Sequence, residues 1–96
     1  MDLKLSPAGL RYRLSLGEAE ALQRGEIIRH AIGPIAWSLL AADLSEGHLD
    51  GLALVVPAMI VRRLLALGQD KHGVTLTLAG IAVTLCIDLK DPAWPR

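Results

Sequence analysis

The sequence predicts an α+β fold, with a curved or barrel-like antiparallel sheet and two short helices. The first observation is a period-two alternation near the start of the chain, where Leu10, Tyr12 and Leu14 fall on one face, as in a half-buried strand. The second is the S-x-x-E capping box at Ser15–Glu18, which is typical of a helix start. The third is the position of glycines at expected turns and helix ends, such as Gly25, Gly33 and Gly68.

The first half of the chain supplies a short strand at 3–5, a strand at 10–14 with Tyr12 directed inward, and a helix at 16–24. Gly25 lies where a left-handed C-terminal cap is favoured. The segment from 26 to 43 then predicts two strands joined by a tight turn at Gly33-Pro34. The second of them, at 35–43, is apolar on both faces, which is typical of a central or covered strand.

The second half begins with a mostly apolar strand at 49–56 and a helix at 57–67. Pro57 suits the first helical position, and Gly68 suits the cap. A loop at 69–72 leads to a hairpin whose strands meet at Gly80 and are rich in β-branched residues. Both halves therefore show a strand, a helix ended by glycine, and two strands around a glycine turn. This order suggests a βαββ duplication, and convergent patterning is the alternative.

The length of 96 residues is enough for one core and no second domain. We expect a single domain over 1–90 and a flexible proline-rich tail over 91–96. The formal net charge is zero, which argues against a general nucleic-acid or anionic-membrane binder.

Several features indicate a cytoplasmic protein. The single cysteine, Cys86, excludes an intramolecular disulfide framework and suits a reducing compartment. The first residues have no apolar core of a secretory signal. The longest apolar run, Leu52–Val61, contains a proline and is about half the length of a membrane span, so we expect no membrane partner.

The first 25 residues resemble a family of small uncharacterised bacterial proteins, a domain of unknown function. Members of that family open with K-I-R-I and continue with I-R-L-R-L-T-x-x-E-V and a glycine, similar to Leu3–Leu5 and Leu10–Gly25 here. Looser similarity follows at Val55–Ala58 and Cys86–Asp88. The resemblance implies an α+β fold and no particular chemistry.

The histidines and nearby carboxylates offer one candidate chemistry. Imidazole and carboxylate suit Zn²⁺ or Fe²⁺, and the weak candidate ligands are His30, His48, Asp50 and His72. Their spacing matches no compact metal motif, and two of the histidines adjoin turn glycines, where solvated histidines are common. A small metal-dependent enzyme using these residues is the alternative function, and we assign no metal ligand.

No other catalytic group stands out. Cys86 lies in an apolar strand, where a thiol stays protonated, and no glycine-rich phosphate loop occurs. Arg11, Arg13 and Arg29 could line one sheet face as an anion or RNA patch, but RNA-binding sheets stack bases on exposed aromatic residues, which are few here. We assign no catalytic residue and expect no cofactor and no nucleic-acid partner.

The leading functional hypothesis depends on an excess of apolar residues over what a single small core accommodates. Strands that are apolar on both faces expose more surface than two short helices can cover, and subunit interfaces commonly absorb such a surplus. We expect a non-catalytic binding or interaction module that forms a homodimer through part of Ile35–Ala42 or Leu52–Val56. A sheet that closes on itself is the alternative.

Overall fold

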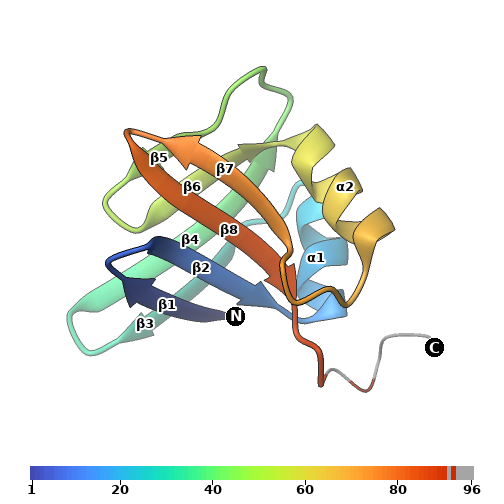
Figure 1. Ribbon diagram of the computed structural model, residues 1–96, viewed down its shortest axis with the longest axis horizontal. Coiled ribbons are helices and arrows are strands. Elements are labelled where there is room, and N and C mark those ends of the chain that lie inside the picture. Colours follow the sequence, from blue (N-terminus) through green and yellow to red (C-terminus); the bar gives the residue numbers. More distant parts are fainter. Residues whose placement is uncertain (91, 93–96) are drawn as a thin grey trace.

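Two four-stranded sheets and two helices form the fold in the computed structural model, which describes residues 1–90 and 92 (Figure 1). The elements follow one another as β1 (Asp2–Ser6), β2 (Gly9–Leu14), α1 (Leu16–Gln23), β3 (Ile28–Ile32), β4 (Ile35–Ala42), β5 (His48–Asp50), β6 (Ala53–Pro57), α2 (Ala58–Leu67), β7 (Val74–Leu78) and β8 (Ile81–Ile87). The expected tail at 91–96 lies outside the described residues except for position 92.

The mixed α+β class is confirmed, whereas the all-antiparallel sheet is wrong. Sheet A has the order β1-β2-β8-β7 and sheet B the order β3-β4-β6-β5. In each, two antiparallel hairpins join through a central parallel pair, β2 with β8 and β4 with β6. The two sheets do not close into a barrel. Hairpins follow from local turns, but a parallel partner is distant in sequence, and local periodicity does not encode it.

Each sheet combines one hairpin from the first half of the chain with one hairpin from the second half. Hairpin β1–β2 joins hairpin β7–β8 in sheet A, and hairpin β5–β6 joins hairpin β3–β4 in sheet B. Each β-β-α-β-β half therefore contributes one hairpin to each sheet. Both halves contain the predicted order of strand, helix and two strands, and in each half one further strand precedes that order.

The predicted helices lie within one residue of their expected bounds at each end. The Ser15 hydroxyl accepts from the Glu18 amide at 3.1 Å, and the Glu18 carboxylate accepts from the Ser15 amide at 3.0 Å, so the capping box is confirmed. Pro57 is the N-cap of α2 rather than its first residue, and Gly68 is its C-cap. Neither helix is long and apolar enough to cross a membrane, among the residues described.

The predicted single strand at 49–56 is wrong, because a turn at Gly51 and Leu52 divides it into β5 and β6. Gly51 has a φ of 59°, a left-handed conformation that glycine adopts without steric cost. The segment predicted as one strand is therefore a very short hairpin, and its first strand, β5, contains only three residues.

One hydrophobic core fills the space between the sheets and continues under both helices, which lie together at one end of the sheets (Figure 1). Tyr12 is fully buried, as predicted, and its hydroxyl donates to the Leu52 carbonyl at 3.0 Å, joining sheet A to the β5–β6 turn. Burial raises the pKa of Tyr12 to about 12, because the charged phenolate is poorly solvated there.

Candidate functional site

The outer face of sheet B is the strongest candidate for a binding surface. Along β4 and β6, the alternate side chains Trp37, Leu39, Leu54 and Val56 are buried in the core. The residues between them therefore face away from the core. Neither helix covers this face, since both lie at the end of the sheets (Figure 1).

Small apolar residues dominate this outer face. Ala31, Ala36 and Ala53 are exposed, while Leu40 and Val55 are half-buried. A hollow of about 460 Å³ lies over the face, bordered by the three alanines, Ser38 and the edge residue Arg29 among others. Small side chains on this face allow another surface to approach closely.

One row of this face has opposite charges at its two ends. The register aligns Arg29 of β3 with Ser38 of β4, Ser38 with Ala53 of β6, and Ala53 with Asp50 of β5. Arg29 and Asp50 are both exposed, at opposite edges of sheet B. Neither side chain has an ion pair with another described residue.

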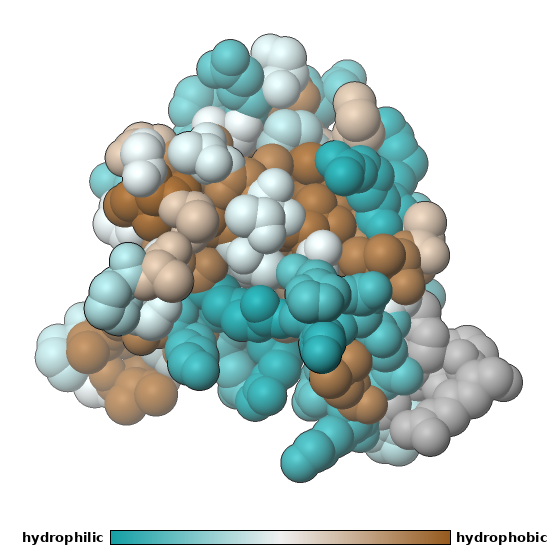
Figure 2. Space-filling view, in the orientation of Figure 1, coloured by the Kyte–Doolittle hydropathy of each residue, from teal (hydrophilic) through white to brown (hydrophobic). Residues whose placement is uncertain are grey.

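The outer face of sheet A has a different character. Its side chains include the cross-strand pair Lys4 and Arg11, and a pair of threonines, Thr75 and Thr84, whose hydroxyls lie 2.9 Å apart. Figure 2 shows the resulting hydrophilic band across the lower half of the view, where β1 and β2 lie in Figure 1. The outer face along β1 and β2 therefore differs in polarity from the outer face along β4 and β6.

The structure separates the residues of the metal-site hypothesis. His30 lies on β3, His48 and Asp50 on β5 at the opposite edge of sheet B, and His72 in the loop before β7. Asp70 accepts from the backbone amide of His72 at 2.7 Å, which is a local loop contact. Within the described part of the chain, no group of three or more His, Cys, Asp or Glu could hold a metal ion.

The arginine face, which the sequence disfavours as an anion or RNA patch, is also divided. Arg11 and Arg13 lie on β2 of sheet A, whereas Arg29 lies on β3 of sheet B. Arg13 forms an ion pair with Asp2 at 2.5 Å, and Arg11 donates to the backbone carbonyl of Lys71. The hydrogen bond and charge of Arg13, opposed by slight burial, hold the pKa of Asp2 below its ordinary value.

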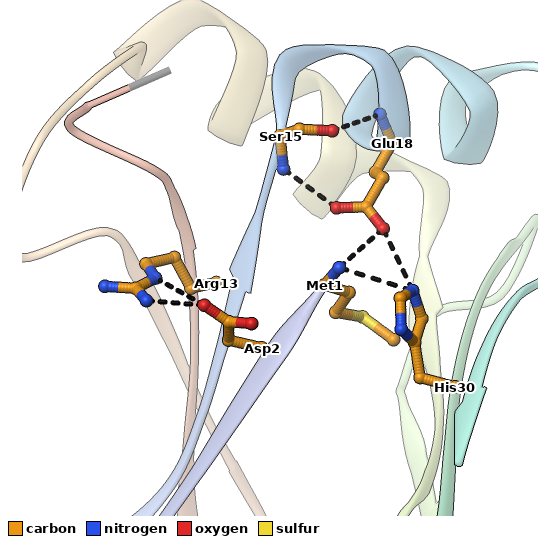
Figure 3. Close-up of polar contacts among 6 residues, drawn as sticks. All are labelled: Met1, Asp2, Arg13, Ser15, Glu18 and His30. Atoms are coloured by element: carbon orange, nitrogen blue, oxygen red, sulfur yellow. Dashed lines mark hydrogen bonds and ion pairs between the residues drawn. The ribbon is translucent and has the colours of Figure 1, made fainter. Parts of the chain in front are cut away.

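A polar cluster links the start of the chain to α1 and β3 (Figure 3). The amino group of Met1 lies 2.8 Å from Glu18 Oε2, and His30 Nε2 lies 3.3 Å from both groups. The ring of His30 stacks on Trp37, with centroids 6.0 Å apart. Burial raises the pKa of Glu18, but the Met1 ammonium and the hydrogen bonds from Ser15 outweigh it, so the pKa lies below its ordinary value.

We expect Glu18→Gln to lower the free energy of unfolding by about 1 kcal/mol at neutral pH. Glutamine can retain the capping box, so the loss reports the charge next to the Met1 ammonium. Because the folded-state pKa of Glu18 is lowered, its contribution is present above the ordinary pKa and is lost as the pH falls through the lowered value. Urea denaturation at neutral pH and at about pH 3 measures the difference.

Glu20→Gln is the matched control, because Glu20 is exposed on the same helix. This variant should change stability by less than about 0.5 kcal/mol. If Glu18→Gln lowers the free energy of unfolding by the same amount at both pH values, the carboxylate charge is not the cause.

Comparisons with protein-family models, curated proteins and solved structures found no match to this chain. The resemblance of the first 25 residues to a bacterial family of unknown function therefore stays a prediction.

Sequence reasoning missed the charged row on sheet B. Its two charged residues were considered separately, Arg29 with the other arginines and Asp50 with the histidines. The alternation in β3 and β4 could have placed Arg29 and Ser38 on one face. The row itself needs the parallel β4–β6 pairing and the β5–β6 turn, which the sequence patterns did not reveal.

Proposed function

We propose that this protein is a non-catalytic interaction module that self-associates face to face through the outer face of sheet B. The observation that carries the proposal is the row from Arg29 through Ser38 and Ala53 to Asp50. It places opposite charges at the two edges of an uncovered face of small apolar side chains. The expected interface segments, within Ile35–Ala42 and Leu52–Val56, both contribute to this face.

A second copy of the chain fits the charge pattern of the row. Consider a two-fold axis that lies in the interface, parallel to the strands and between β4 and β6. Rotation about this axis lays β3 of one copy over β5 of the other, so Arg29 faces Asp50 of the partner subunit. A two-fold contact is repeated, and both rim charges of each copy would then be paired. The zero net charge adds no overall repulsion between copies.

The size of the face predicts a weak, reversible dimer. Four strands about 4.8 Å apart, with about three outward rows spaced near 6.7 Å, cover roughly 400 Å² per copy. That is about half of what each partner buries in a standard interface. The association should therefore depend strongly on protein concentration, with a dissociation constant in the micromolar range or weaker.

We expect Arg29→Asp and Asp50→Arg each to weaken dimerisation about tenfold, and an equimolar mixture of the two variants to restore it. Each single reversal places like charges opposite each other twice, at up to about 1 kcal/mol per rim contact. In the mixed dimer both contacts are again oppositely charged. Sedimentation velocity across a wide concentration range measures the dimer fraction.

Arg62→Asp is the control, because it reverses an exposed charge on α2 away from this face. It should leave the dissociation constant within about twofold of the parent value. A protein that stays a 10.3 kDa monomer at all concentrations would contradict the proposal. So would dimers that are insensitive to both reversals, since their interface would lie elsewhere.

The same proposal includes a cytoplasmic location, a bacterial source and an origin by duplication. The lone cysteine supports the location, because Cys86 is buried and forms no disulfide. Its sulfur lies 3.8 Å from the carbonyl oxygen of Tyr12. The opening sequence similarity supports the source. The identical pairing order of sheets A and B supports duplication of a β-β-α-β-β unit.

A further inference from the structure

A second, independent feature is a cleft at the open edge of sheet A. Its volume is about 460 Å³, within the range of small-molecule sites. One wall comes from β1 and β2, through Leu3, the cations Lys4, Arg11 and Arg13, and the carboxylate Asp2 that pairs with Arg13. The other wall comes from the β3–β4 hairpin, through Ile32 and Trp37. Strand β1 is an edge strand, so the cleft lies where the two sheets fail to join.

The charged wall contains cations that the fold leaves uncompensated. Lys4 and Arg11 are directly opposite in the β1–β2 register, and like charges in such a pair repel and destabilise the sheet. Asp2 neutralises Arg13 rather than either of these residues. Lys4 has no ion pair with the described residues, and Arg11 donates only to a backbone carbonyl. An anion between the two cations would remove the repulsion.

The opposite wall is apolar and combines an exposed residue, Ile32, with a buried one, Trp37. Ile32 is 70% exposed, the highest value among the exposed large hydrophobic residues described. Trp37 borders the same cleft, and its Nε1 is a buried donor without a hydrogen-bond partner in the described chain. Figure 2 shows hydrophobic surface at the lower left, where the β3–β4 hairpin ends in Figure 1, next to the hydrophilic band.

We propose that this cleft binds a small organic anion that joins a phosphate or carboxylate group to an apolar group. Lys4 and Arg11 bind the anionic group through charge-assisted hydrogen bonds, and Ile32 and Trp37 contact the apolar group. Neither wall would suffice alone, because inorganic anions lack the apolar contact and neutral apolar molecules lack the ion pair. Trp37 also borders the hollow over sheet B, but the site uses none of the outward residues of the self-association face.

The test is an NMR titration of the full chain with phenyl phosphate, inorganic phosphate and benzyl alcohol. We expect phenyl phosphate to shift the amides of Leu3, Lys4 and Arg11 and the indole N–H of Trp37, and to bind at least about tenfold more tightly than the other two probes. Lys4→Gln should weaken its binding about tenfold. Arg62→Gln, which removes an exposed charge on α2, should change binding less than about twofold.

A thermal melt distinguishes a binding role of Lys4 from a structural one. Because Lys4 opposes Arg11, Lys4→Gln should leave the melting temperature unchanged or raise it, while binding is lost. A lower melting temperature would assign Lys4 to the stability of the fold and contradict the proposal. Equal binding of phenyl phosphate and inorganic phosphate, or binding of single-stranded DNA without binding of phenyl phosphate, would also overturn it.

Discussion

Replacement of Leu85 by alanine is expected to lower the free energy of unfolding by about 3–5 kcal/mol. Leu85 is fully buried at the middle of β8 and belongs to the core between the sheets. On one side its strand pairs with β2 and on the other with β7. The surrounding backbone therefore cannot collapse easily into the cavity that the shorter side chain leaves. Urea denaturation monitored by circular dichroism measures the loss.

Ile81→Ala is the control on the same strand, because Ile81 is 40% exposed at the hairpin end. We expect it to cost less than about 1.5 kcal/mol, since less apolar surface is lost and no closed cavity forms. Comparable losses for the two variants would show that Leu85 is not packed in a rigid core as described.

We expect Gly73→Ala to lower the free energy of unfolding by more than about 3 kcal/mol, through two separate causes. The φ of Gly73 is 62°, in the left-handed region, where a side chain costs about 1–2 kcal/mol. In addition, a Cβ at this position would lie 2.2 Å from the Leu85 carbonyl oxygen. Because that oxygen belongs to the backbone of a central strand, either the sheet or the loop that contains Gly73 must move.

Gly51→Ala separates the two causes. Its φ of 59° is nearly the same, but a Cβ there would meet no atom within 4 Å. This variant should lose only the conformational part, about 1–2 kcal/mol, in the same denaturation experiment. Equal losses at the two glycines would contradict the close approach between Gly73 and β8.

Local structure could be predicted from the sequence where a single short-range effect decides it. The capping box at Ser15–Glu18 is such a case, because its two hydrogen bonds join residues three apart. The turn at Gly33-Pro34 and the alternation that buries Tyr12 are others. The β5–β6 turn was missed because Leu49–Val56 is apolar almost throughout, although the dipeptide Asp50-Gly51 is typical of a tight hairpin turn.

Long-range pairing could not be predicted in the same way. The parallel contact of β2 with β8 joins Leu10 to Val83 and Leu14 to Ile87, near opposite ends of the chain. Nothing in either strand distinguishes this partner from an adjacent antiparallel one. The candidate site depends on such pairing, since Arg29 and Asp50 share a row only through β4 and β6. The apolar surplus was therefore predictable, whereas the charges that orient a partner on it were not.

The exchange of hairpins between the halves also determines when the fold can form during synthesis. When the ribosome has released β1 to β4, the nascent chain contains one hairpin of each sheet but neither complete sheet. The inner edges of β2 and β4 stay unpaired until β8 and β6 emerge, and such edges promote aggregation. Sheet B can be completed once β6 has left the ribosome, whereas sheet A must wait for β8. The inner edge of β2 is thus exposed longest during translation, and protection at that stage falls to chaperones or to rapid completion of the chain.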